Sequence, residues 1–209
     1  MRFSLEKKFI YLAYPKTGST SVRMMLDKQS DHLILKEKGQ YHDHWSAKEY
    51  KDVFKLNGWD WNDFYSFLTL RNPWDKYVSN YFYSKPDADF KPWYEDGYDQ
   101  NTAMEHDFKT WVKHFLKDKK SAPHGCPPLG YFAFENNECI VSDLFTIENF
   151  EQNALPILIE KGIVEESSIL PHENTTERKV GYREYYDNET AKLVGDFTSD
   201  EIEIGKYEF

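Results

Sequence analysis

Residues 9–21 read FIYLAYPKTGSTS, and this stretch decides the expected fold. Its first half is apolar and aromatic and stops at Pro15, which is the pattern of a buried strand. A turn rich in hydroxyl groups follows, and the apolar residues Val22, Met25 and Leu26 then recur at helical spacing. The first backbone N–H groups of a helix lack intrahelical partners, and the helix dipole adds partial positive charge there. Because Lys16 adds a full charge beside them, the stretch predicts a site for phosphate or sulfate.

Bulk composition limits the possible partners. The chain has 209 residues, which predicts one domain over residues 1–209. Its formal net charge of −10 argues against binding to nucleic acid or anionic membranes, because both require a positive surface. Cys126 and Cys139 are expected to be free thiols. The apolar run before Pro15 is too short for a signal peptide or a membrane span, so a cytoplasmic location is expected.

The rest of the chain alternates between strand and helix patterns. Ser46 and Glu49 form a capping-box pattern that predicts a helix over residues 46–56. The other predicted strands cover residues 32–35, 64–70 and 140–147, and the other predicted helices cover residues 74–83, 103–116 and 150–160, the last kinked at Pro156. Residues 85–100, 121–130 and 171–181 are predicted to be irregular, and the C-terminal region helical. This order predicts a three-layer α/β fold, with a central, mainly parallel sheet of four or five strands flanked by helices.

Two segments resemble the PAPS-dependent sulfotransferases. Residues 15–21, PKTGSTS, are similar to the family's 5′-phosphosulfate loop. Residues 67–81, FLTLRNPWDKYVSNY, resemble its 3′-phosphate motif, in which an Arg at a strand end and a Ser eight residues later hold one phosphate. Those residues are Arg71 and Ser79 here. Weaker likeness at residues 44–50, 143–150 and 174–207 favours the branch that includes carbohydrate O-sulfotransferases. The resemblance implies the PAPS sulfotransferase fold, which is related to nucleotide kinases.

The resemblance also implies a role for each residue of the two motifs. Lys16 would stabilise negative charge on the leaving phosphate as the bond to sulfur breaks. The residues expected to donate backbone and hydroxyl hydrogen bonds to that group are Thr17, Gly18, Ser19, Thr20 and Ser21. Arg71 can bind a phosphate through two parallel N–H bonds. Arg178 and Lys179 either close over the 3′-phosphate or form a solvated charge run, and no metal site is expected.

The general base is less well defined, because the chain has seven histidines. His44 is the first choice, since it heads the helix between the two phosphate motifs and matches a His of the resembling branch. His42 is the second choice, and a Glu or Asp base is the third.

The predicted activity is transfer of a sulfuryl group from PAPS to a hydroxyl acceptor, of a saccharide by resemblance, with PAP as product. A P-loop-type nucleotide or adenylyl-sulfate kinase is an alternative, but Lys16 precedes Gly18 where a P-loop has its lysine after a glycine. A non-catalytic module that binds PAP or a glycan is the third reading. It would bind PAP without turnover.

Overall fold

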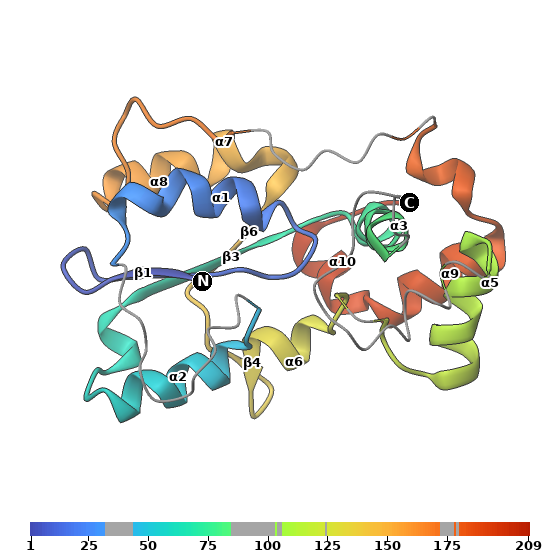
Figure 1. Cartoon of the computed structure of the whole chain (residues 1–209), viewed down its shortest axis with the longest axis horizontal. Coiled ribbons are helices and arrows are strands. Elements are labelled where there is room, and N and C mark those ends of the chain that lie inside the picture. Colours follow the sequence, from blue (N-terminus) through green and yellow to red (C-terminus); the bar gives the residue numbers. More distant parts are fainter. Residues whose placement is uncertain (32–43, 85–102, 104–105, 124, 172–177, 179) are drawn as a thin grey trace. The chain divides into compact units, whose positions relative to one another are not determined.

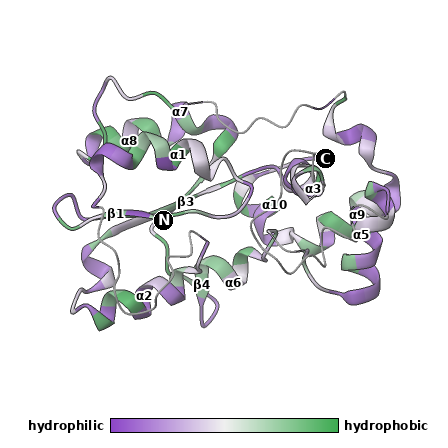
Figure 2. Cartoon of the chain, in the orientation of Figure 1, coloured by the Kyte–Doolittle hydropathy of each residue, from purple (hydrophilic) through white to green (hydrophobic). Residues whose placement is uncertain are grey.

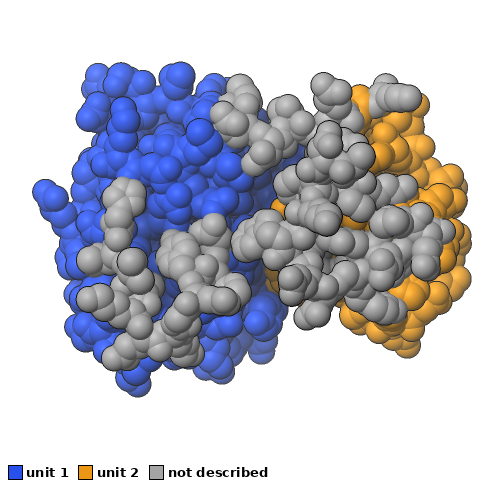
Figure 3. All heavy atoms as spheres, in the orientation of Figure 1, with its two compact units in different colours: residues 1–71, 129–174 blue, residues 72–128, 175–209 orange. Residues whose placement is uncertain are grey.

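The structure is a computed structural model that describes residues 1–31, 44–84, 103, 106–123, 125–171, 178 and 180–209 (Figure 1). The chain divides into two compact units (Figure 3). Unit 1 comprises residues 1–71 and 129–174, and unit 2 comprises residues 72–128 and 175–209. Each unit contains a cluster of buried hydrophobic side chains. The single domain expected from chain length stays a prediction.

Unit 1 is built on a mixed four-stranded sheet with the strand order β1-β2-β3-β6. The strands are β1 (Arg2–Ser4), β2 (Phe9–Leu12), β3 (Tyr65–Leu70) and β6 (Asp143–Thr146). β2, β3 and β6 are parallel, whereas β1 pairs with β2 in the antiparallel direction. β3 lies inside the sheet and is buried on both faces, and its buried residues include the polar Ser66 and Thr69 as well as apolar side chains. The expected α/β class is confirmed.

Helices cover both faces of this sheet (Figure 1). One face carries α1 (Ser19–Leu26), α7 (Phe150–Asn153) and α8 (Leu155–Glu160), and the other carries α2 (Ala47–Leu56) and α6 (Leu129–Ala133). On the first face, Phe9, Phe67 and Phe145 of the strands pack with residues of α1 and α8. α2 and α8 each carry hydrophobic and hydrophilic residues, as expected for helices that cover a sheet (Figure 2).

Local signals in the sequence set several boundaries in unit 1. Ser46 caps α2, and its backbone N–H donates to Glu49 Oε2 at 2.7 Å, so the predicted capping box is confirmed. The helix predicted over residues 150–160 is divided at Ala154 into α7 and α8. Pro156 lies in the first turn of α8, where its missing N–H costs no intrahelical bond.

Four short segments complete unit 1. These are the 3₁₀ turns η1 (Asp27–Gln29), η2 (Trp61–Asp63) and η4 (Ile147–Asn149), and the hairpin of β4 (Phe134–Glu135) and β5 (Glu138–Cys139). Asn136 and Asn137 link the two hairpin strands with φ angles of 52° and 66°. Positive φ at both central residues fits a type I′ turn.

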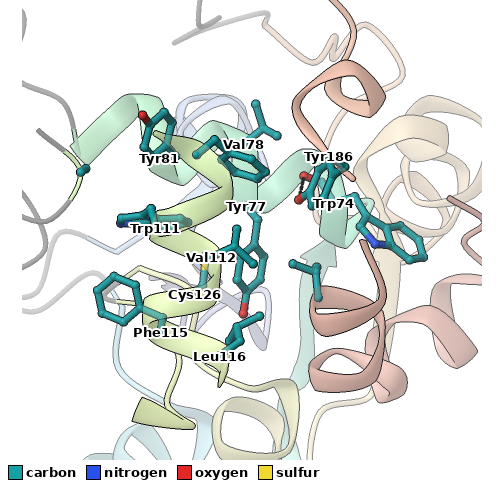
Figure 4. Close-up of a cluster of buried hydrophobic side chains, with 13 residues drawn as sticks. Trp74, Tyr77, Val78, Tyr81, Trp111, Val112, Phe115, Leu116, Cys126 and Tyr186 are labelled. Carbon is teal, nitrogen blue, oxygen red and sulfur yellow. Dashed lines mark hydrogen bonds between the residues drawn. The ribbon is translucent and has the colours of Figure 1, made fainter. Parts of the chain in front are cut away.

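In the part that the structure describes, the regular secondary structure of unit 2 is helical, with irregular segments between the helices. Its elements are α3 (Pro73–Ser84), α5 (Phe108–Lys113), the π-helical η3 (His114–Lys119), the 3₁₀ turn η5 (Tyr182–Tyr185), α9 (Asn188–Phe197) and α10 (Ser199–Gly205). Figure 4 shows its core, where Tyr77 and Tyr81 of α3 face Trp111 and Phe115. Thus α3 confirms the helix predicted over residues 74–83. The later part of the helix predicted over residues 103–116 is observed as α5, followed by the π-helical η3.

Some predictions fall outside the described residues. These are the strand at residues 32–35, the loop at residues 85–100 and most of the basic loop at residues 171–181. Among the described helices, none is both long and apolar enough to span a bilayer.

Candidate functional site

The turn between β2 and α1 has the backbone geometry of an anion site. Lys16 and Gly18 both adopt left-handed conformations, with φ angles of 61° and 73°. Turns of this kind bring neighbouring backbone N–H groups to one concave side, where they attract anions. Gly18 also occupies the N-cap position of α1, so no side chain caps the helix, and no acidic residue lies in its first turn. The N-terminal end of α1 therefore presents its dipole and its first N–H groups to a ligand.

Arg71 joins this turn from the neighbouring strand. It directly follows β3, which runs parallel to β2, so both strands end at the same edge of the sheet. Its Nη1 donates a hydrogen bond to the main-chain oxygen of Lys16 at 3.2 Å. Ligands bind at this edge in open α/β sheets. The structure thus brings the two basic residues of the predicted motifs together within unit 1.

His44 is held against the same turn. Its Nδ1 lies 2.7 Å from the main-chain oxygen of Ala13, the residue that directly follows β2. Because a carbonyl oxygen only accepts hydrogen bonds, Nδ1 carries the proton, and in the neutral ring Nε2 is the nitrogen that can accept one. The side chain of His44 is exposed, so Nε2 can meet a substrate proton. This is the arrangement that a general base needs.

The hydroxyl groups of the turn do not all face outward. Thr17 is fully buried, and its Oγ1 donates to the main-chain oxygen of Tyr14 at 2.8 Å. A contribution of Thr17 to ligand binding would therefore come from its backbone N–H. Ser19 and Ser21 are also largely buried, whereas Thr20 is more accessible.

Arg23 is a further basic residue at this site, and the sequence analysis did not select it. Its Nη2 donates to Thr20 Oγ1 at 3.3 Å, and its Nε donates to the main-chain oxygen of Ser19 at 3.3 Å. The spacing in the sequence could have indicated this contact. Arg23 follows Thr20 by three positions and Ser19 by four, and residues at these distances are neighbours on a helix. Arg23 therefore adds positive charge beside Ser19 and Thr20 in the candidate anion site.

The other predicted residues lie elsewhere or outside the described residues. Ser79 lies in α3 of unit 2 and is buried. Arg178 also belongs to unit 2, where it forms an ion pair with Asp75. His42 and Lys179 are outside the described residues. Ser79, Arg178, Lys179 and His42 therefore stay predictions.

A separate cavity of about 300 Å³ lies near the opposite ends of the parallel strands. Its lining includes Phe64 and Ser66 at the start of β3, and Val141 and Ser142 just before β6. Within the described residues, no group of three or more His, Cys, Asp or Glu side chains could hold a metal ion.

Comparison with known proteins adds no relative: no family model matches the chain, and no curated protein or solved structure gives a significant match. The described residues thus form an α/β protein with a candidate anion site at the carboxyl edge of its sheet.

Proposed function

We propose that the protein is a PAPS-dependent sulfotransferase that acts on a hydroxyl group, with a saccharide as the acceptor class. The observation that carries the proposal is the convergence on one turn of Lys16, Arg71 and His44, which come from three separate segments of unit 1. An anion site alone fits many ligands. A tautomer-fixed histidine beside two cations adds the base that attack by a hydroxyl requires.

In the proposed reaction, the acceptor oxygen forms a bond to sulfur, and its proton passes to Nε2 of His44. The bond between sulfur and the bridging phosphate oxygen breaks, and its electron pair stays on that oxygen. Lys16 and the N–H groups at the start of α1 stabilise the charge that develops there. Positioning and charge stabilisation carry this chemistry, as in phosphoryl transfer. No proton on the leaving group and no metal ion is required.

Arg71 is proposed to hold the 3′-phosphate of the nucleotide, because its guanidinium offers several donors in a rigid fork. Its bond to the Lys16 carbonyl uses one of five N–H groups.

The test is transfer of label from ³⁵S-PAPS to a panel of unsulfated oligosaccharides, with PAP measured as the second product. The wild-type protein should form labelled saccharide and PAP in equal amounts. His44→Ala should lose activity, whereas His114→Ala in unit 2 serves as a matched histidine control. Release of PAP with no labelled acceptor, equal in wild-type protein and His44→Ala, would contradict the proposed base.

A further inference from the structure

Beneath the anion-site turn, three buried hydroxyl groups form one continuous chain of hydrogen bonds. Tyr11 Oη lies 3.0 Å from Thr69 Oγ1, and Thr69 Oγ1 lies 3.1 Å from Thr17 Oγ1. Thr17 Oγ1 in turn lies 2.8 Å from the main-chain oxygen of Tyr14. The side chains of Tyr11, Thr69 and Thr17 are all fully buried. The chain therefore runs from the interior of the sheet to the turn.

The direction of every bond in this chain follows from counting hydrogens. A carbonyl oxygen can only accept, so the single hydroxyl hydrogen of Thr17 goes to Tyr14. Thr17 Oγ1 must then accept from Thr69, and Thr69 Oγ1 must accept from Tyr11. Burial raises the pKa of the Tyr11 hydroxyl well above its usual value, so the first donor keeps its proton. All three hydroxyls are satisfied, and each bond polarises the next.

The last bond of the chain encloses Lys16. Thr17 bonds to the carbonyl of Tyr14, so the bond closes a turn that has Pro15 and Lys16 between its ends. Lys16 is there in a left-handed conformation, which is strained for a residue with a Cβ atom. Such strain persists only where the surroundings fix the backbone on both sides. Thr17 supplies that restraint on one side of Lys16, and the Arg71 bond to the Lys16 carbonyl supplies another.

We infer that Tyr11, Thr69 and Thr17 are positioning residues that hold Lys16 and the first N–H groups of α1 in their anion-binding arrangement, although none of the three hydroxyls touches the ligand. The inference rests on the proposed function for its ligand, which is PAP. It predicts that loss of a buried hydroxyl weakens PAP binding, and that the loss is greatest at the end of the chain nearest the turn.

The test is calorimetric titration with PAP of Thr17→Val, Thr17→Ser, Thr69→Val and Tyr11→Phe. Thr17→Val should weaken binding about tenfold, because it removes the bond across Lys16 and leaves the Thr69 hydroxyl without its acceptor. Thr17→Ser keeps the hydroxyl and should stay within about twofold of wild type. Tyr11→Phe should have the smallest effect, since it leaves the other two bonds in place.

Ser66 provides the matched control. Ser66 lies in β3, the strand that also carries Thr69, and its side chain is buried. Its Oγ lies 3.2 Å from Ser142 Oγ near the start of this strand. Ser66→Ala should lower thermal stability without changing the PAP dissociation constant. Equal affinity in wild type and Thr17→Val overturns the inference, as does equal weakening in Thr17→Ser or in Ser66→Ala. If Thr17→Val does not fold, the PAP affinities of Thr69→Val and Tyr11→Phe are compared with those of wild type and Ser66→Ala instead. Affinities equal to wild type in both variants then overturn the inference.

Hydrogen exchange separates this inference from the proposed function. Amide exchange at residues 16–21 should rise in Thr17→Val and stay unchanged in Ser66→Ala, whether or not PAP binds. Failure of the wild-type protein to bind PAP would reject the proposed function alone. Unchanged exchange at residues 16–21 in Thr17→Val would reject the positioning role alone.

Discussion

The guanidinium of Arg71 donates a hydrogen bond to the main-chain oxygen of Lys16, with 3.2 Å between Nη1 and O. The bond links the end of β3 to the turn that follows β2, so Arg71 acts on the backbone of the turn as well as carrying charge. A guanidinium has five N–H groups in a fixed fork, so this bond is compatible with a two-point grip on a phosphate. One residue thus connects the two sequence motifs that resemble the sulfotransferases.

Arg71→Lys is expected to weaken PAP binding by about tenfold although it keeps the positive charge, because an ammonium cannot hold both the Lys16 carbonyl and a bidentate phosphate. Lys28→Ala removes an exposed charge of unit 1 and serves as the control. Calorimetric titration with PAP at two salt concentrations measures the affinity of each variant and its dependence on charge. If Arg71→Lys binds PAP as tightly as wild type, Arg71 acts by charge alone and its proposed geometry is wrong.

Gly18→Ala is expected to destabilise the protein by about 2–5 kcal/mol, for two separate reasons. The residue has a φ of 73°, and an added Cβ would lie 2.7 Å from Cγ1 of Ile147. Gly58 is the matched control, because it has a φ of 75° and open space around it. Gly58→Ala should therefore cost only about 1–2 kcal/mol, the conformational part.

Urea unfolding of these two variants, of Ile147→Ala and of the double variant Gly18→Ala/Ile147→Ala separates the two causes. The steric account requires that the effects of the two changes are not additive, since Ile147→Ala removes both of the closest atoms. Strictly additive losses would show that the clash with Ile147 does not matter.

The proposed base predicts a pH profile. His44 must be neutral to accept a proton, so kcat should fall on the acid side as the imidazole becomes protonated. His44→Ala should lose about 10²- to 10⁴-fold in kcat and keep its PAP affinity, because the imidazole acts on the acceptor. Single-turnover rates from pH 5 to 8 give the profile. An acid limb that survives in His44→Ala would assign it to another group, such as His42.

Unit 2 contains a buried ion pair that predicts a large effect on stability. Lys76 Nζ lies 2.7 Å from Glu201 Oε1, and the two residues are 0% and 1% exposed. Glu201→Gln should cost about 3–5 kcal/mol, because it leaves the Lys76 ammonium buried without its counter-charge. Asp196→Asn breaks the exposed pair with Lys192 and should change stability by no more than about 1 kcal/mol.

The double variant Lys76→Met/Glu201→Leu tests the cause of that loss by removing both charges. It should recover most of the stability lost in Glu201→Gln, because apolar side chains of similar size avoid the cost of burying charge. Chemical unfolding of the three proteins measures the differences. A double variant that is less stable than Glu201→Gln would show that the pair is a net source of stability.

Local rules predicted the elements that carry the site. The capping box of Ser46 and Glu49 defines α2, and the apolar run at residues 64–70 gives β3. Both depend on neighbours in sequence, so the sequence was sufficient for them. β1 was not predicted, because a three-residue antiparallel edge strand has no periodicity to detect. The β4–β5 hairpin was also missed, although Asn136-Asn137 is a turn signal for two positive φ angles.

The side-chain contacts of the site could not be predicted in the same way. Arg71 and Lys16 are 55 positions apart, and Tyr11 and Thr69 are 58 apart, so their contacts depend on the register of β2 against β3. Thr17 was predicted to offer a hydroxyl to the ligand, but strand pairing places Thr69 beneath it and turns that hydroxyl inward. The sequence predicts an anion-binding chemistry for the turn, and the tertiary fold decides which of its hydroxyl groups are buried.

Calorimetric titration of the wild-type protein with PAP in the absence of Mg²⁺, beside a titration with ATP and Mg²⁺, distinguishes a sulfotransferase nucleotide site from that of a kinase. Binding of PAP alone requires no acceptor, so it isolates the nucleotide site. The account predicts metal-independent binding of PAP that weakens strongly in Lys16→Ala and not in Lys28→Ala. Binding of ATP with Mg²⁺ and none of PAP would contradict it, and a kinase would then be the better reading of the same turn.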